Sequence, residues 1–199
     1  MDSRREQLLD VGRDFFSKRH YKDVWIDDIA AAAGVSKGLL YHYFPSKRDF
    51  YVAAIRAEAE DMRQRTKPRT DLPPEEQLRG SLDVYLDYVE DHEAGYRTLF
   101  GGTASDPELV AIIRHYDELQ VARLLEALTG GQSPEALRTA LHGWIASNRA
   151  VVLDWLDRRE MGREDLRELM VHALTGFVQA AQQVDPAMEI GPPPPQPKS

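Results

Sequence analysis

Apolar residues recur along the whole chain at the spacing of amphipathic helices, and no stretch alternates apolar and polar residues as a strand does. Capping residues, glycines and prolines mark where the helical segments begin and end. We expect helices over residues 3–18, 27–33, 37–44, 46–65, 75–92, a short segment around 96–100, then 106–128, 133–158 and 163–183. The pattern therefore predicts an all-α protein.

Residues 25–44 predict two short helices joined by a tight turn. Gly34 follows the first helix, where a glycine can take the left-handed conformation without steric cost, and Ser36 can cap the second helix through its side-chain oxygen. Leu40 and Phe44 lie one turn apart and can bury against the first helix. This spacing is typical of a helix-turn-helix, whose second helix enters a DNA major groove. Helix pairs of this kind also occur inside ordinary all-α cores, so the residues alone leave both interpretations open.

The second helix of this pair turns groups outward that suit DNA. Its N-terminus offers backbone N–H groups and a cation to a phosphate, and a glycine near its start lets the backbone come close. Its aromatic rings carry hydrogen-bonding tips that suit phosphates and base edges. The candidate DNA contacts are Ser36, Lys37, Gly38, Tyr41, His42, Tyr43 and Lys47.

The segments 29–30, 33–38 and 40–47 resemble the N-terminal DNA-binding signature of the TetR family of transcriptional regulators. The resemblance covers about residues 5–52. It implies an all-helical homodimer that binds an operator palindrome in double-stranded DNA and releases it when a small molecule enters a C-terminal helical core. It also implies that the seven candidates named above contact DNA, while Leu40 and Phe44 serve packing.

Two positions depart from the family's pattern. Members usually have a threonine where this chain has Trp25, capping the first helix of the motif and touching a phosphate, and an indole does neither in the same way. We expect Asp27 to cap a slightly shorter helix instead. The family also tends to have glycine where His20 stands, and we expect His20 to adopt the positive φ of that turn.

Two long helices at the end of the chain carry apolar stripes wider than packing inside one small domain requires. This predicts that the pair packs against a second copy as a four-helix bundle, in agreement with the resemblance. The alternative, that both helices only line the core of one chain, stays open. We assign Leu141, Val152, Trp155, Leu169, Ala173 and Phe177 to the dimer interface.

Aromatic residues are concentrated in the middle of the chain, with a few polar groups nearby. An apolar cavity with a few polar groups is typical of a small-molecule site, and such a cavity favours a lipophilic or aromatic effector. Ordinary core aromatics are the alternative. The candidate pocket residues are Tyr85, Tyr88, Tyr96, Phe100, Tyr116, Trp144 and Asn148.

The net charge of −8 is unevenly spread. Residues 1–70 hold 14 Lys and Arg against 11 Asp and Glu, whereas residues 71–199 hold 11 against 22. The part that carries the motif is therefore locally basic, as nucleic-acid binding requires. We divide the chain into a DNA-binding domain at 1–50, a connecting helix and linker at 51–74, a ligand-binding and dimerisation domain at 75–184, and a disordered proline-rich tail at 185–199.

Other chemistries find little support. The chain has no cysteine, and its six histidines include no i, i+4 pair, so we expect no metal and no cofactor, although a site assembled from distant residues stays open. Residues 34–38 match G-x-S-x-G, but no strand precedes them as a nucleophile elbow requires. We expect no enzyme, no membrane partner and a cytoplasmic location. The main alternative is a helical scaffold or ligand-binding protein whose helix-turn-helix no longer reads DNA.

Overall fold

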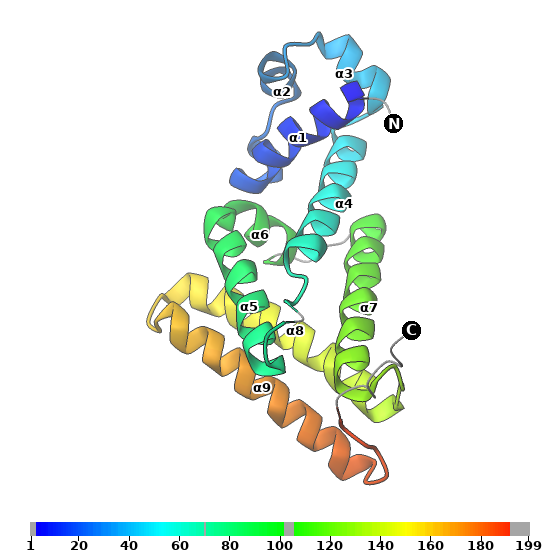
Figure 1. Cartoon of the computed structure of the whole chain (residues 1–199). Helices are drawn as coiled ribbons and strands as arrows, with labels where there is room; N and C mark the ends of the chain where they lie inside the picture. The colour runs from blue at the N-terminus through cyan, green and yellow to red at the C-terminus, as the bar shows by residue number, and fades with distance from the viewer. Residues whose placement is uncertain (1–2, 70, 102–105, 192–199) are drawn as a thin grey trace. The chain divides into compact units, whose positions relative to one another are not determined.

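The computed structural model describes residues 3–69, 71–101 and 106–191, and within these ranges it contains helices and no strand (Figure 1). The predicted all-α class is confirmed. A turn of 3-10 helix, η1 (Tyr21–Asp23), follows the first helix. The α-helices are α1 (Ser3–Lys18), α2 (Ile26–Ala32), α3 (Lys37–Tyr43), α4 (Lys47–Arg65), α5 (Pro74–Asp91), α6 (Glu93–Phe100), α7 (Pro107–Thr129), α8 (Glu135–Arg158) and α9 (Arg163–Val184).

Most helix ends lie within one or two residues of the predicted ones, because side chains cap them. The Oγ of Ser46 accepts a hydrogen bond from the Asp49 N–H at 3.0 Å before α4. The Oδ1 of Asp106 accepts one from the Glu108 N–H at 2.9 Å before α7. At α8 the predicted start at residue 133 was wrong by two positions, because Pro134 has an extended ψ of 133° and precedes the helix, which begins at Glu135.

The chain divides into two compact units, and α5 and α7 contribute to both. The first unit comprises Met1–Thr66 and Val84–Ile112, and the second comprises Lys67–Asp83 and Ile113–Ser199. This division differs from the predicted domains, because the segment 84–112 packs with the N-terminal helices. The predicted linker at 66–74 does lie next to a boundary between the units.

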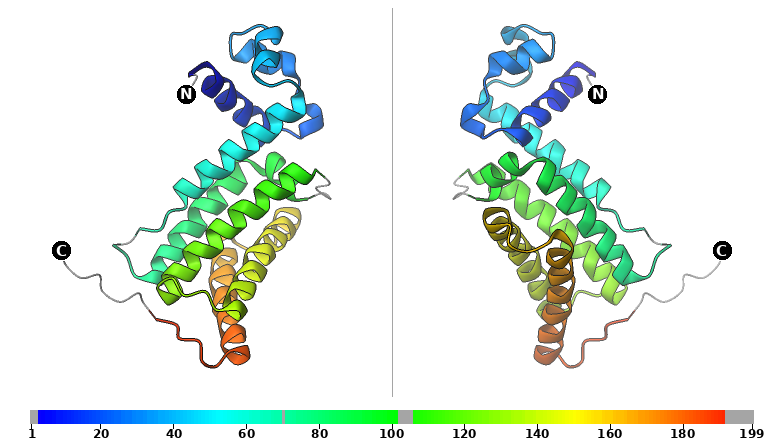
Figure 2. Two further views of the ribbon diagram at one scale, coloured as in Figure 1. Left: turned by 90° about the vertical axis from the view of Figure 1, so that its right-hand side faces the viewer. Right: turned by 90° about the vertical axis from the view of Figure 1, so that its left-hand side faces the viewer.

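The core of the first unit is built around Phe50 on α4, which is fully buried. Its ring lies 5.8 Å from that of Phe16, and α1 approaches it through Gly12, where a Cβ would lie 2.4 Å from the Phe50 ring. The helices α2 and α3 close on this core through Ile29 and Leu40, neither of which is exposed. Figure 2 shows α1 to α4 from two further sides. The three-helix head that the sequence predicts is therefore formed.

The helix α6 packs against the C-terminal end of α1 through Gly95. A Cβ on Gly95 would lie 2.7 Å from the carbonyl oxygen of Phe16 and from the Cα of Ser17, so the contact has no room for a side chain. Next to it, the Nδ1 of His20 lies 3.0 Å from the Oγ1 of Thr98. The positive φ expected for His20 was wrong. His20 has φ −63° and an extended backbone, and the chain turns in η1, which follows it.

A polar cluster joins α1, α4 and α5 within the first unit. Arg13 donates from Nε to Glu58 at 2.6 Å and pairs through Nη2 with Asp61 at 2.9 Å. Burial of the Tyr88 hydroxyl, together with the adjacent Glu58 carboxylate, raises the pKa of Tyr88. Tyr88 therefore stays protonated and donates its hydrogen bond to Glu58. This cluster uses one of the residues assigned to an effector pocket as a structural group.

In the second unit, α8 and α9 pack along each other. The indole N–H of Trp144 donates to the carbonyl oxygen of Met170 at 2.9 Å. Gly143 allows close approach, because a Cβ there would lie 2.9 Å from the ring of Phe177. The apolar stripes of the two helices thus serve largely to hold them together within one chain.

This packing corrects half of the predicted dimer interface. Leu141 and Val152 are 0% exposed and Trp155 is 6% exposed, so they have almost no surface left for a second chain. The indole N–H of Trp155 donates to the Met161 carbonyl oxygen at 2.8 Å within the chain. The other three assigned residues, all on α9, keep accessible surface: Leu169, Ala173 and Phe177.

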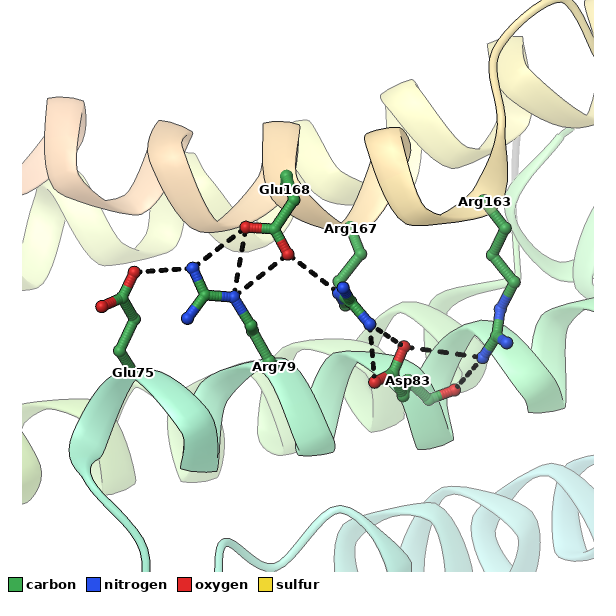
Figure 3. Close-up of polar contacts among 6 residues, drawn as sticks. All are labelled: Glu75, Arg79, Asp83, Arg163, Arg167 and Glu168. Atoms are coloured by element: carbon green, nitrogen blue, oxygen red, sulfur yellow. Dashed lines mark hydrogen bonds and ion pairs between the residues drawn. The ribbon is translucent and has the colours of Figure 1, made fainter.

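Alternating charges tie the first half of α5 to the start of α9 (Figure 3). Arg79 donates to the Glu168 carboxylate at 3.0–3.1 Å, and Arg167 pairs with Asp83 at 3.0 Å. Figure 3 shows one continuous series of polar contacts that runs through Glu75, Arg79, Glu168, Arg167, Asp83 and Arg163. Half-buried networks of this kind hold their members more firmly than isolated surface pairs.

The described part of the predicted disordered tail, residues 185–191, has defined contacts within the second unit. Met188 is buried, and the Gly191 N–H donates to the Leu128 carbonyl oxygen at 3.0 Å. The expectation of disorder is therefore wrong for this part. The rest of the tail, residues 192–199, lies outside the described residues.

We predict that Gly95→Ala lowers the free energy of unfolding by about 1–3 kcal/mol, because its methyl group would overlap the α1 backbone. The matched control is Gly80→Ala in α5, where no atom lies within 4 Å of an added Cβ. That control should be unchanged or stabilised by about 0.5–1 kcal/mol through helix propensity. Urea unfolding measures both variants, and equal stabilities would contradict the contact.

Candidate nucleic-acid interface

The turn between α2 and α3 is fixed by its backbone. Gly34 has φ +65°, the left-handed conformation expected of it, and its N–H donates to the Ala31 carbonyl oxygen at 3.1 Å. The Val35 N–H donates to the Ala30 carbonyl oxygen at 2.9 Å. Ser36 then caps α3, since its Oγ accepts the Leu39 N–H at 3.1 Å. The predicted glycine turn and serine cap are confirmed.

Core packing fixes which side of α3 points outward. Leu40 and Phe44 are buried, as predicted from their spacing, whereas Leu39 and Tyr41 are each 37% exposed. Of the seven candidate DNA contacts, those that are exposed are Ser36, Lys37, Gly38, Tyr41 and His42, and those that are half-buried are Tyr43 and Lys47. The helix thus presents a mixed surface of cation, backbone, aromatic rings and one aliphatic side chain. Sequence reasoning passed over Leu39, although its place between Gly38 and the core residue Leu40 implies an outward position.

Lys37 forms an ion pair that the sequence did not predict. Its Nζ lies 3.0 and 3.1 Å from the two carboxylate oxygens of Asp27. The hydrogen bond to Asp27, reinforced by the charge of that carboxylate, raises the pKa of Lys37, so the lysine stays protonated at neutral pH. Both side chains are exposed, and exposed pairs are weak, so Lys37 can exchange Asp27 for a phosphate.

Asp27 does not cap α2, so that expectation was wrong. The helix begins at Ile26, and Trp25 occupies the N-cap position with φ −104° and ψ 135° and no side-chain cap hydrogen bond. Val24 and Ile26 on either side of Trp25 are buried, which leaves the indole 67% exposed. Burial of these two neighbours anchors the start of α2 in place of a side-chain cap.

The two cations next to α3 lie against aromatic rings. The Nζ of Lys47 lies 4.4 Å from the ring centroid of Tyr21, and partial burial lowers the pKa of Lys47. The Arg5 guanidinium lies 5.1 Å from the ring centroid of Phe44, the C-cap residue of α3. Such cation–π contacts orient long side chains without neutralising them. Positive charge is therefore held next to the C-terminal end of the helix.

The candidate effector residues fall into both units. Tyr85, Tyr88, Tyr96 and Phe100 belong to the first, and the hydroxyls of Tyr85 and Tyr96 lie 2.6 Å apart. The rings of Tyr96 and Phe100 lie 4.8 Å apart. The remaining three belong to the second unit and are Tyr116, Trp144 and Asn148. The structure brings Tyr85, Tyr96 and Phe100 together, whereas Tyr88 lies against Glu58. The pocket assignment as a whole stays a prediction.

The described ranges offer neither a metal site nor a membrane span. No group of three or more His, Asp or Glu side chains in these residues is arranged to hold a metal ion. Within the same residues, no helix is both long and apolar enough to cross a membrane.

Both parts of the chain match known protein families. Residues 8–54 match the bacterial regulatory proteins of the tetR family, and residues 74–177 match the tetracyclin repressor-like C-terminal domain. A crystal structure of a tetR-family transcriptional regulator from Streptomyces coelicolor is similar with a TM-score of 0.82 and 30% identity, covering 94% of this chain and 85% of that one.

The relatives include both an activator and a repressor of transcription. The chain is 29% identical over 145 residues to the transcriptional activator FasR of Mycolicibacterium smegmatis, covering 70% of this chain and 65% of that protein. It is 30% identical over 96 residues to the transcriptional repressor KstR2 of Mycobacterium tuberculosis, covering 47% and 48%. The chain thus spans less than two thirds of the length of either relative. These relatives are regulators of transcription and not enzymes.

The C-terminal match covers more than half of the chain, and the N-terminal match coincides with the helix-turn-helix whose geometry is described above. The structural relative from Streptomyces extends the likeness over nearly all of the chain. On this evidence the chain belongs to the tetR family of bacterial regulatory proteins.

Proposed function

We propose that the protein is a homodimeric, ligand-responsive regulator of transcription that binds a palindromic operator in double-stranded DNA through α3. The observation that carries the proposal is the geometry of α3. Its N-terminal half is exposed, capped by Ser36 and held on a packed core by Leu40. A recognition helix needs this combination of rigid support and an accessible N-terminal turn.

Local charge supports a DNA partner despite the net charge of −8. The helix α3 contains no acidic residue, and Arg5 and Lys47 lie next to its C-terminal end. What governs binding to the phosphate backbone is the field at the contact surface, and its contribution falls steeply with salt.

An accessible apolar stripe on α9 supports the dimer. Leu169, Ala173 and Phe177 are four residues apart, so they lie on one side of the helix. Leu169 is 46% exposed, which is unusual for a leucine in a packed helix pair. A twofold dimer would present two copies of α3 to successive major grooves about 34–36 Å apart.

We further propose that the protein represses transcription and leaves its operator when a lipophilic or aromatic effector binds. The relative KstR2, a repressor, supports repression, whereas the relative FasR, an activator, supports activation. The aromatic group Tyr85, Tyr96 and Phe100 supports the effector class. An effector releases DNA only by binding the DNA-incompetent state more tightly. A reporter gene placed behind the operator decides the sign, since repression requires expression to rise when the regulator is deleted.

The function is tested by Tyr41→Ala. We expect operator affinity to fall roughly tenfold to a hundredfold in gel shifts, because each of two copies loses a contact worth about 1 kcal/mol. The control Val110→Ala truncates a side chain of similar exposure, 38% against 37%, on α7. A protein that binds no duplex, with no dependence on salt, would instead fit the helical scaffold alternative.

The Lys37–Asp27 pair gives a gain-of-affinity prediction. Asp27→Asn removes a negative charge beside α3 and leaves Lys37 to pair with a phosphate. We expect binding to random duplex to tighten about threefold to tenfold, with a steeper dependence on salt. Fluorescence anisotropy at several salt concentrations measures both quantities.

The matched control for this variant is Asp28→Asn, which makes the same charge change one residue further along α2. Asp28 lies 3.8 Å from Arg19 and not next to Lys37. A smaller effect is expected there, and equal effects of the two variants would show that only net charge matters.

The dimer is tested by Leu169→Lys. A lysine in the middle of the α9 stripe would place two like charges at a twofold interface, so we expect monomers by light scattering and a large loss of operator affinity. Val110→Lys makes a similar change on α7 and should remain dimeric. A Leu169→Lys variant that stays dimeric would move the interface away from this stripe.

A further inference from the structure

The exposed large hydrophobic residues of the first 66 positions are concentrated in the helix-turn-helix. Within the described part of this range they are Trp25, Leu39 and Tyr41. Trp25 and Tyr41 carry polar atoms that water or phosphate can satisfy, but Leu39 has none. An exposed leucine at the centre of a binding surface calls for an apolar partner.

The position of Leu39 is rigidly determined. Its N–H donates to the Ser36 Oγ at 3.1 Å, which makes it the third residue of α3. The next residue, Leu40, is fully buried in the core. Successive residues of an α-helix are about 100° apart, so Leu39 cannot turn inward without pulling Leu40 out. Its side chain therefore projects from the first turn of α3, beside Lys37 and Gly38.

The composition of α3 limits how it can read bases. Guanine, adenine and cytosine are read in the major groove chiefly by Arg or Lys, by Asn or Gln, and by Asp or Glu, in that order. The sequence of α3, KGLLYHY, offers only Lys37 from this set, and Lys37 is the first residue of the helix, next to the backbone N–H groups that favour a phosphate. The apolar group at the base edges of the major groove is the C5-methyl of thymine.

We propose that Leu39 contacts thymine C5-methyl groups and gives the protein a preference for an A·T pair opposite the first turn of α3. The inference rests on the proposed function, since it concerns the same surface. Leu39 is then a specificity-determining residue, whereas Ser36 and Lys37 position the helix on the backbone.

The test uses the full-length protein and a duplex that the wild type enriches from a random pool. Each thymine is replaced in turn by deoxyuridine, which keeps base pairing and removes only the methyl group. We expect one symmetry-related pair of positions, one in each half-site, at which the replacement weakens wild-type binding about threefold to fivefold per half-site. Leu39→Ala should bind the thymine and uracil duplexes equally.

Tyr41→Ala is the matched control on the same helix. It should lose affinity but keep the response to the methyl group. Leu39→Ala should keep the thermal stability of the wild type, because the side chain is exposed and the alanine favours the helix.

One set of results would contradict this inference alone, and another would contradict the proposed function as well. If the wild type ignores every thymine replacement, or if Leu39→Ala still responds, Leu39 does not read the methyl group, while operator binding stands. If the wild type enriches no sequence and shows no salt-dependent duplex binding, the regulator function fails and this inference fails with it.

Discussion

The candidate interface depends on one backbone corner. Gly34 takes a left-handed conformation that costs other residues about 1–2 kcal/mol, and this lets the chain reverse between α2 and α3 within a few residues. Two hydrogen bonds back to α2 and the Ser36 cap then satisfy the backbone groups that the reversal exposes. Once this corner is set, burial of Leu40 fixes the rotation of α3. The outward positions of Leu39 and Tyr41 follow from the corner and from this one buried contact.

Several carboxylates of the first unit are paired with cations of the same unit. In the first unit Asp27 is held by Lys37, Asp28 lies near Arg19, and Glu58 is bound by Arg13. A carboxylate with a cation beside it contributes little field at a distance, because the two charges largely cancel. The cations next to the C-terminal end of α3 lie over aromatic rings instead, and so keep their charge available. Which cations keep their charge available near α3 thus depends on pairing geometry, which a count of charged residues does not show.

Local signals in the sequence were sufficient for most of the fold. Helix period and capping residues such as Ser36, Ser46 and Asp106 are short-range features, so the boundaries they predict match the structure. The same holds for the buried face of α3, which follows from the spacing of Leu40 and Phe44. Of the candidate interface, the residue set on α3 could be predicted in this way, except for Leu39, which carries no polar group that would mark it as a DNA contact.

What could not be predicted depends on residues distant in the chain. The partner of Lys37 lies ten positions away across the turn, and the burial of Leu141 and Val152 depends on how α8 meets α9. His20 needed no positive φ because η1 makes the turn by another route. A wide apolar stripe predicts burial but not the partner. In this chain the assigned apolar residues of α8 are buried by the rest of the same chain, whereas those of α9 keep accessible surface.

The two helices that contribute to both units, α5 and α7, are held by polar contacts within each unit. In the second unit Arg79 and Asp83 of α5 are tied to α9, and in the first unit Tyr88 is bound to Glu58 of α4. Asp83 and Tyr88 are separated by less than two helical turns, so α5 cannot slide along its axis without breaking polar contacts at one end or the other. The start of α7 is held in the same way, because Arg48 of α4 pairs with Asp106 at 2.7 Å, while further along Asp117 pairs with Arg149 at 2.6 Å. Within the first unit, both of these polar contacts reach α4, through Glu58 and Arg48. The helix α4 begins one turn after α3 ends, so it links these contacts to the candidate interface.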